Sequence, residues 1–126
     1  MPSYDPDMGP DLEVWRTLDE GEQINLVLTY HRRVRAKLPN PLAHATIHVV
    51  VENQIALGKE IPVQSTLARL QEEGLDRHDA IHAIGSILAG HMYDLVRGPA
   101  PSGDPNTAYY QRLKSLTAVE WRAQAE

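Results

Sequence analysis

Residues 40–58 read NPLAHATIHVVVENQIALG, and this stretch carries the strongest fold signals in the chain. Asn40 followed by Pro41 is typical of a helix start, because asparagine caps the first backbone amides and proline suits the first turn. Gly58 is a typical helix stop. The run of three valines after His48 would also suit a strand. The distance between the start and stop signals favours a helix over residues 41–57.

Histidines repeat at a regular spacing in this stretch. His44 and His48 lie four residues apart, and Glu52 follows after four more. Residues four apart share one face of a helix, and they would share a face of a strand as well. A second copy of the pattern H-x-x-I-H contains His78 and His82. Each histidine pair flanks an apolar stripe at helical spacing, so we expect two histidine rows at the border of the core.

The rest of the chain predicts an all-α fold, a compact bundle of about five helices. The first long helix should begin near Leu18, after a capping box formed by Thr17 and Glu20, and end before Pro39. The other predicted helices are 62–73, a longer one from 77 to 97 that Asp76 caps, and 106–123.

Composition divides the chain into three parts. Residues 1–11 are rich in Pro, Asp and Gly, and we expect a mobile N-terminus there. Residues 12–98 form the predicted core of the helical bundle. Residues 99–126 are predicted to be a linker followed by a C-terminal helix that docks on the bundle.

Overall composition excludes several classes of function. With 126 residues the chain suits one domain, and its net charge of −5 argues against nucleic-acid binding. No run is long enough for a membrane span, and the N-terminus lacks the features of a secretory signal. The absence of cysteine excludes thiolate ligands and fits a cytoplasmic location.

The histidine rows predict a metal site between helices. Short connections make neighbouring helices antiparallel, so the two rows should lie at similar height and His31 should approach them. His91, on the far border of its helix, should not join. The candidate ligands are His44, His48, Glu52, His78, His82 and His31. Glu52 is the candidate catalytic residue, as a general base for metal-bound water.

Imidazoles with one carboxylate suit a transition metal, which could be Zn, Fe, Ni, Mn or Cu, in a mononuclear or dinuclear centre. Metal-dependent hydrolysis and oxygen chemistry are the two enzymatic hypotheses. The alternative is a non-enzymatic interaction or regulatory protein with structural histidines. Under this hypothesis the protein forms a homodimer through apolar residues of the last helix, Trp121 above all. A histidine-based pH sensor is a third hypothesis.

The residues around the two motifs also resemble a known family. The stretch from Leu42 to Gln54, followed by the stretch from Gly74 to Ser86, is similar to a small bacterial family classed as a domain of unknown function. The resemblance covers about half of the chain. It implies a compact all-helical bacterial protein, and it implies no activity.

Overall fold

The computed structural model describes residues 2–125, and within that range all regular structure is helical. In order, the elements are α1 (Leu12–Trp15), α2 (Glu20–Arg33), α3 (Pro41–Ala56), the 3₁₀ helix η1 (Gly58–Glu60), α4 (Val63–Glu72), α5 (Arg77–Arg97), α6 (Thr107–Ser115) and α7 (Ala118–Ala125). No helix in this range is both long and apolar enough to cross a bilayer.

The all-α prediction is confirmed, but the expectation of about five helices is slightly wrong, because residues 2–125 contain seven α-helices. One addition is α1, which is too short to show a helical period in the sequence. The other arises because the predicted C-terminal helix is two helices. Leu116 has an extended backbone, and the Thr117 hydroxyl accepts a hydrogen bond from the Glu120 amide, so a new helix begins there.

Local capping explains most helix boundaries. The side chain of Asn40 accepts a hydrogen bond from the Ala43 amide at the start of α3, and Asp76 caps α5 in the same way. The predicted capping box at Thr17 is wrong. Asp19 and Glu22 form the box instead, while the Thr17 hydroxyl donates to a carbonyl of α1. The first long helix also ends earlier than expected, because Arg35 has a φ of 57°.

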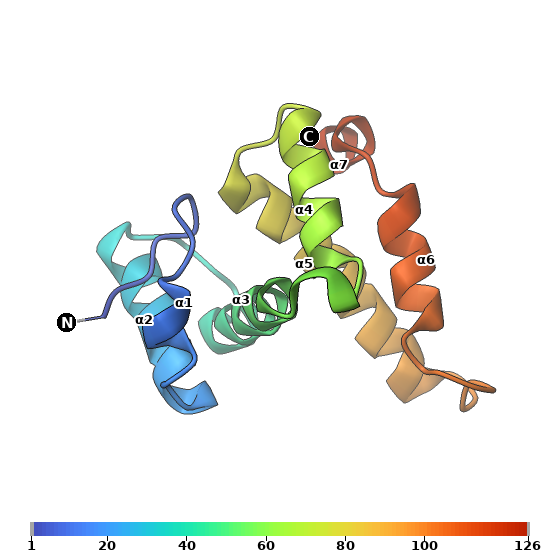
Figure 1. Ribbon diagram of the computed structural model, residues 1–126, viewed down its shortest axis with the longest axis horizontal. Helices are drawn as coiled ribbons and strands as arrows, with labels where there is room; N and C mark the ends of the chain where they lie inside the picture. The colour runs from blue at the N-terminus through green and yellow to red at the C-terminus, as the bar shows by residue number, and fades with distance from the viewer. Residues whose placement is uncertain (1, 126) are drawn as a thin grey trace.

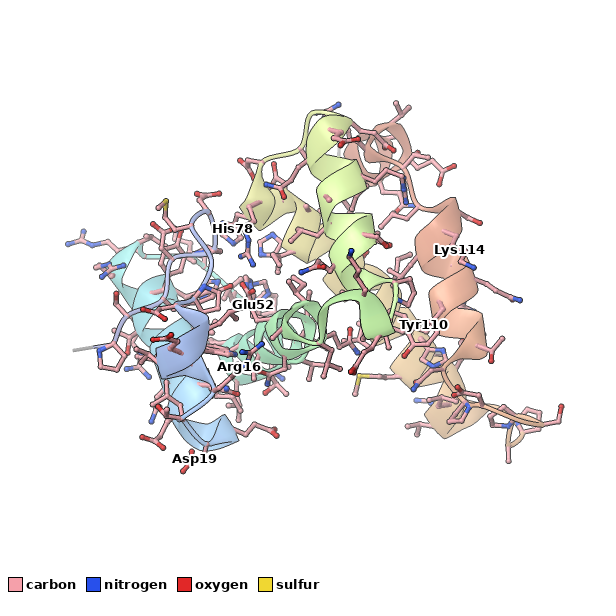
Figure 2. All side chains as sticks on the ribbon, in the orientation of Figure 1. Arg16, Asp19, Glu52, His78, Tyr110 and Lys114 are labelled. Atoms are coloured by element: carbon pink, nitrogen blue, oxygen red, sulfur yellow. The ribbon has the colours of Figure 1, made fainter. Side chains whose placement is uncertain are left out.

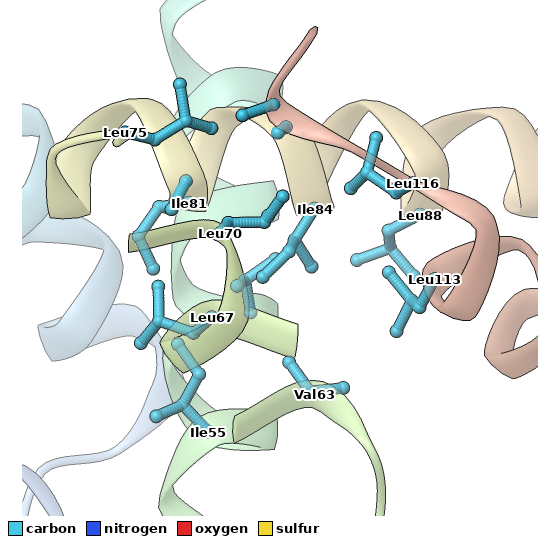
Figure 3. Packing of buried hydrophobic residues seen from close by; sticks show 14 of the residues in the cluster. Ile55, Val63, Leu67, Leu70, Leu75, Ile81, Ile84, Leu88, Leu113 and Leu116 are labelled. Carbon is cyan, nitrogen blue, oxygen red and sulfur yellow. The ribbon is translucent and has the colours of Figure 1, made fainter. Parts of the chain in front are cut away.

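Figure 1 shows α3 between α2 on one side and α4 and α5 on the other, and a hydrophobic cluster lies on each of these two sides of α3. The larger cluster joins α3 to α4, α5 and α6, and Figure 3 shows its leucine and isoleucine side chains. The smaller cluster includes Trp15, Val27 and Val49, on the side of α1 and α2. The sequence predicted a single apolar stripe on the helix of residues 41–57. That prediction is incomplete, because α3 buries apolar residues on two sides.

Both ends of the chain contact the bundle. Tyr109 and Leu113 of α6 are buried in the larger cluster, and Trp121 of α7 is partly buried against it. Near the N-terminus, the ring of Tyr4 is 1% exposed and lies in the smaller cluster, 5.9 Å from the ring of Trp15. The segment before α1 thereby reaches the middle of α3.

Candidate metal centre

Five of the six histidines gather where α2, α3 and α5 meet. His31 comes from α2, and the two H-x-x-I-H pairs come from α3 and α5. The ring centroids of His78 and His82 are 4.3 Å apart, and that of His48 lies 5.0 Å from both His82 and His31. In Figure 2, His78 lies at the start of α5, facing the N-terminal helices, with Glu52 close by.

Four of these side chains are close enough to hold one metal ion. The four are His31, His48, His78 and His82, and one nitrogen of each lies within 4.8 Å of the others. The fifth, His44, contacts the same group, because its Nε2 lies 3.1 Å from the Nε2 of His48. The structure thus brings together all five histidines that the sequence singled out, including His31.

Close packing of α3 against α5 aligns the two histidine rows. Gly85 lies at the contact, where an added Cβ would come within 2.8 Å of the Cγ2 atom of Ile47. Real side chains do not approach so closely, so a glycine is needed for this spacing. The close approach lets the Nε2 atoms of His48 and His82 come within 3.1 Å of each other.

The tautomer of His48 follows from its neighbours. The Tyr4 hydroxyl donates to Oε2 of Glu52 at 2.7 Å, and the oxygen of this hydroxyl lies 3.0 Å from Nδ1 of His48. Because a tyrosine has only one hydroxyl proton, Nδ1 of His48 must be the donor in the second contact. The lone pair of His48 is therefore on Nε2, which points at His44 and His82.

Two other histidines of the cluster have a buried nitrogen without a partner, and so does His91, which lies outside the cluster. Nδ1 of His31 lies 2.8 Å from the carbonyl oxygen of Val27, so it donates there and Nε2 carries the lone pair. Among the described residues, neither this Nε2 nor that of His78 has a hydrogen-bond partner. Buried polar atoms are rarely left unpaired, since doing so costs about 1–3 kcal/mol each.

Glu52 lies beside the cluster but has other partners. Arg77 holds both of its carboxylate oxygens, with N···O distances of 2.7 and 2.8 Å, and Tyr4 donates to one of them. The carboxylate is 1% exposed. Glu52 therefore reaches the imidazoles through the Tyr4 hydroxyl. This contact pattern differs from the direct ligand or base that the sequence suggested.

The N-terminal segment covers this ion pair. Arg77 donates to the carbonyl of Pro6 at 2.9 Å, and the amide of His78 donates to Asp7 at 3.3 Å. Gly9 lies against the guanidinium group, where an added Cβ would be 3.0 Å from the Cζ atom. Residues 4–9 are thus held against the start of α5.

The surroundings of His44, His48, His78 and His82 favour the neutral imidazole. Burial and then the neighbouring histidines lower the pKa of His44 and of His82 to about 4, and that of His48 to about 2. Burial is also the main cause that lowers the pKa of His78. For Tyr4, burial and then the charge of Glu52 raise the pKa, so its hydroxyl keeps its proton. Neutral imidazole is the form that binds metals.

Sequence reasoning missed two residues of the site. Tyr4 is 44 residues from His48, and no local pattern links the two. Its only signal is an aromatic residue in a segment of Pro, Asp and Gly. Arg77 directly precedes His78, but nothing in the sequence pairs it with Glu52. As expected, His91 lies apart from the cluster, where its ring stacks on Tyr109 with centroids 5.6 Å apart.

Comparison with known proteins identifies a family. The model of the family described as Domain of unknown function (DUF1841) matches residues 22–115. The matched range contains all five clustered histidines and the ion pair between Glu52 and Arg77, while Tyr4 lies outside it. No curated protein and no solved structure matches the chain.

Proposed function

We propose that this chain, which belongs to the DUF1841 family, binds one transition-metal ion through its clustered histidines. The proposed ligands are His31, His48, His78 and His82, and His44 lies beside them as a fifth donor. The family is one of unknown function, so the proposal rests on the geometry of the cluster.

The observation that carries the proposal is the convergence of lone pairs. Nε2 of His48 carries one lone pair and lies 3.1 Å from two other imidazole nitrogens, so it can accept a proton from only one of them. Nε2 of His31 and of His78 has no partner among residues 2–125. A single cation would satisfy the lone pairs of His48 and His31 together, and also that of His78 in the tautomer whose Nε2 carries no proton, which hydrogen bonds within the cluster cannot do.

The distances suit an ion of ordinary size. With metal–nitrogen bonds of about 2.0–2.1 Å, adjacent ligand atoms are roughly 2.8–3.0 Å apart in octahedral complexes and roughly 3.3–3.4 Å apart in tetrahedral complexes, a span of roughly 2.8–3.4 Å. The separations of 3.1 Å around Nε2 of His48 fall in this range. The widest separation in the group of four, up to 4.8 Å, requires small inward movements of the partly exposed imidazoles of α5.

The donor set narrows the choice of metal. Neutral imidazoles suit Zn, Cu, Fe and Ni, whereas Mn, Mg and Ca prefer carboxylates. Since Arg77 and Tyr4 occupy the oxygens of Glu52, no carboxylate bridge for a second ion is offered from that residue. We therefore favour a mononuclear centre over the dinuclear alternative.

Glu52 acts in this proposal as a positioning residue. Metal-binding histidines commonly donate their second ring N–H to a partner that fixes ring orientation. Here Tyr4 is that partner for His48, and Glu52 with Arg77 holds Tyr4 in place. The backbone carbonyl of Val27 has the same role for His31.

The reaction class depends on the ion. Bound Zn would supply an activated water and favour hydrolysis, whereas Fe or Cu would favour oxygen chemistry. His44, His78 and His82 are partly exposed, whereas His31 and His48 are buried, so a substrate could approach the cluster from the side of the first three.

The test is metal analysis of protein prepared without a histidine tag, beside the variants His48→Ala and His82→Ala. We expect about one equivalent of a transition metal in the native protein and loss of the metal in both variants. His91→Ala is the matched control, because this buried histidine lies on α5 outside the cluster. Cobalt(II) loading gives a second readout, since its visible spectrum reports the ligand geometry.

Two results would overturn the proposal. One is absence of metal in the native protein together with no uptake of Zn, Fe(II), Ni or Cu. The other is equal loss of metal in the His91→Ala control and the cluster variants, which would indicate nonspecific binding. In either case the histidines would serve only packing, as in the interaction-protein hypothesis.

A further inference from the structure

A cleft lies against one side of the histidine cluster. Its volume is about 490 Å³, within the range of small-molecule sites. His44, His48 and His82 form its polar end. The three histidines whose Nε2 atoms are linked by distances of 3.1 Å therefore border a space large enough for a molecule.

The remaining walls of the cleft are mostly apolar, and the other polar residues that line it are Ser86 and Asn40, whose Oδ1 accepts a hydrogen bond from the Ala43 amide. Ile47 of α3, Ile81 of α5 and Trp121 of α7 line it, and Ala89 lies at its edge on α5. None of its lining residues within the described chain is charged. The one hydroxyl, that of Ser86, already donates to a backbone carbonyl at 2.8 Å. The histidines are thus the principal groups that could orient a polar ligand.

From this arrangement we propose that the cleft binds a small molecule with an apolar body and one metal-coordinating head group. The inference rests on the proposed metal site, and it names the class of ligand for that site. The head group would bind the ion beside His44 and His82, and the body would lie against Ile47 and Trp121. A carboxylate, hydroxamate or azole attached to a ring or a short alkyl chain has this chemistry.

The dimensions support an occupant of this class. An apolar cavity of about 150 Å³ accommodates benzene. The cleft, at about 490 Å³, has room for a ring with substituents. A macromolecular partner would ordinarily meet a polar rim with charged groups, and this cleft has no charged lining residue in residues 2–125. Its chemistry therefore favours a neutral or singly anionic small molecule over a charged peptide.

The experiment compares two probes, imidazole and 4-phenylimidazole, on the cobalt(II)-loaded 126-residue chain. Both have the same coordinating nitrogen, and only the second has an apolar body. We expect the visible spectrum to change with both, and 4-phenylimidazole to bind about tenfold more tightly or better, because its ring is buried on binding. Metal content is measured in every sample.

Variants locate the binding of the phenyl ring. Ala89→Phe fills the cleft from an exposed position on α5, so it should remove most of the advantage of 4-phenylimidazole without lowering metal content. Trp121→Ala removes one wall and should reduce the same advantage. Ala68→Phe is the matched control on the exposed face of α4, away from the cleft, and should leave both affinities unchanged.

The outcomes separate this inference from the metal site. If the protein binds metal normally but the two probes bind equally, or if Ala89→Phe has no more effect than Ala68→Phe, the cleft proposal is overturned and the metal site stands. If no metal binds, both proposals fall together. A dimer in sedimentation experiments that Ala89→Phe converts to monomer would show that a second copy covers the cleft, and would also overturn the inference.

Discussion

The contribution of the Tyr4 hydroxyl to stability and to metal affinity can be measured separately from that of its ring. Tyr4→Phe keeps the buried ring but removes the acceptor for Nδ1 of His48 and one donor to Glu52. Glu52 keeps both contacts with Arg77. The substitution therefore leaves one buried N–H unpaired, and we expect the metal-free protein to lose about 1–3 kcal/mol of unfolding free energy.

Metal affinity should change as well. Without the hydroxyl, His48 loses the group that holds its ring and its tautomer, a loss that ordinarily costs about 10–100-fold in metal affinity. Competition against a chromophoric chelator measures this affinity, and urea unfolding of the metal-free protein measures stability. Tyr30→Phe is the matched control, since its ring packs on His31 and His78 while its hydroxyl takes no part in the hydrogen bonds of the cluster.

The combination of results tests the reasoning. Lower stability with unchanged metal affinity would refute the positioning role of Tyr4 and leave it a packing residue. No change in either quantity would refute the hydrogen-bond assignment itself. An equal fall in affinity for Tyr30→Phe would show that the effect does not come from the hydroxyl of Tyr4.

Three further perturbations follow from the structure. Arg77→Met removes the ion-pair partner of the buried Glu52 carboxylate and should lower the free energy of unfolding by about 3–5 kcal/mol, as measured with urea. Arg112→Met breaks an exposed ion pair and should lower it by less than about 1 kcal/mol. Similar losses in the two variants would contradict the burial of the pair between Arg77 and Glu52. Gly85→Ala should destabilise the folded protein by about 1–3 kcal/mol, because the added Cβ would collide with Ile47. This loss should outweigh the higher helix propensity of alanine. An increase in the melting temperature would count against the close contact between Gly85 and Ile47. The pKa of His82 is lowered to about 4 from an ordinary value near 6.5, so between these pH values the unfolded chain binds more protons than the folded chain. The stability of the metal-free protein should therefore fall as the pH falls from about 6.5 to 4. A urea midpoint that stays constant over this pH range would argue against a neutral, buried His82 imidazole.

Local signals predicted the helices well wherever one residue controls a helix end. The caps at Asn40 and Asp76 are correct because a side-chain oxygen three residues before an amide is enough to start a helix. The cap at Thr17 failed because two overlapping patterns compete there. Asp19 has a glutamate three residues later, and the Thr17 hydroxyl is already bonded to α1.

The part of the candidate site that depends on helix periodicity could be predicted from the sequence. Spacing by four placed each histidine pair on one face, and helix direction brought His31 to the same height. The partners of Glu52 could not be predicted, since they lie 25 and 48 residues away in sequence. The position of α3 between two hydrophobic clusters could not be predicted from the sequence either, because a helix that is buried on two sides has no single apolar stripe.

The placement of α3 between two clusters has a consequence for hydrogen exchange. The smaller cluster contains few buried apolar side chains, so α2 should open at a lower free energy than α4 and α5. An ion held jointly by α2, α3 and α5 would prevent α2 from opening until the ion had left. Amide protection in α2 would then rise with occupancy of the site, and exchange rates in this one helix would report whether the protein holds its metal inside a living cell.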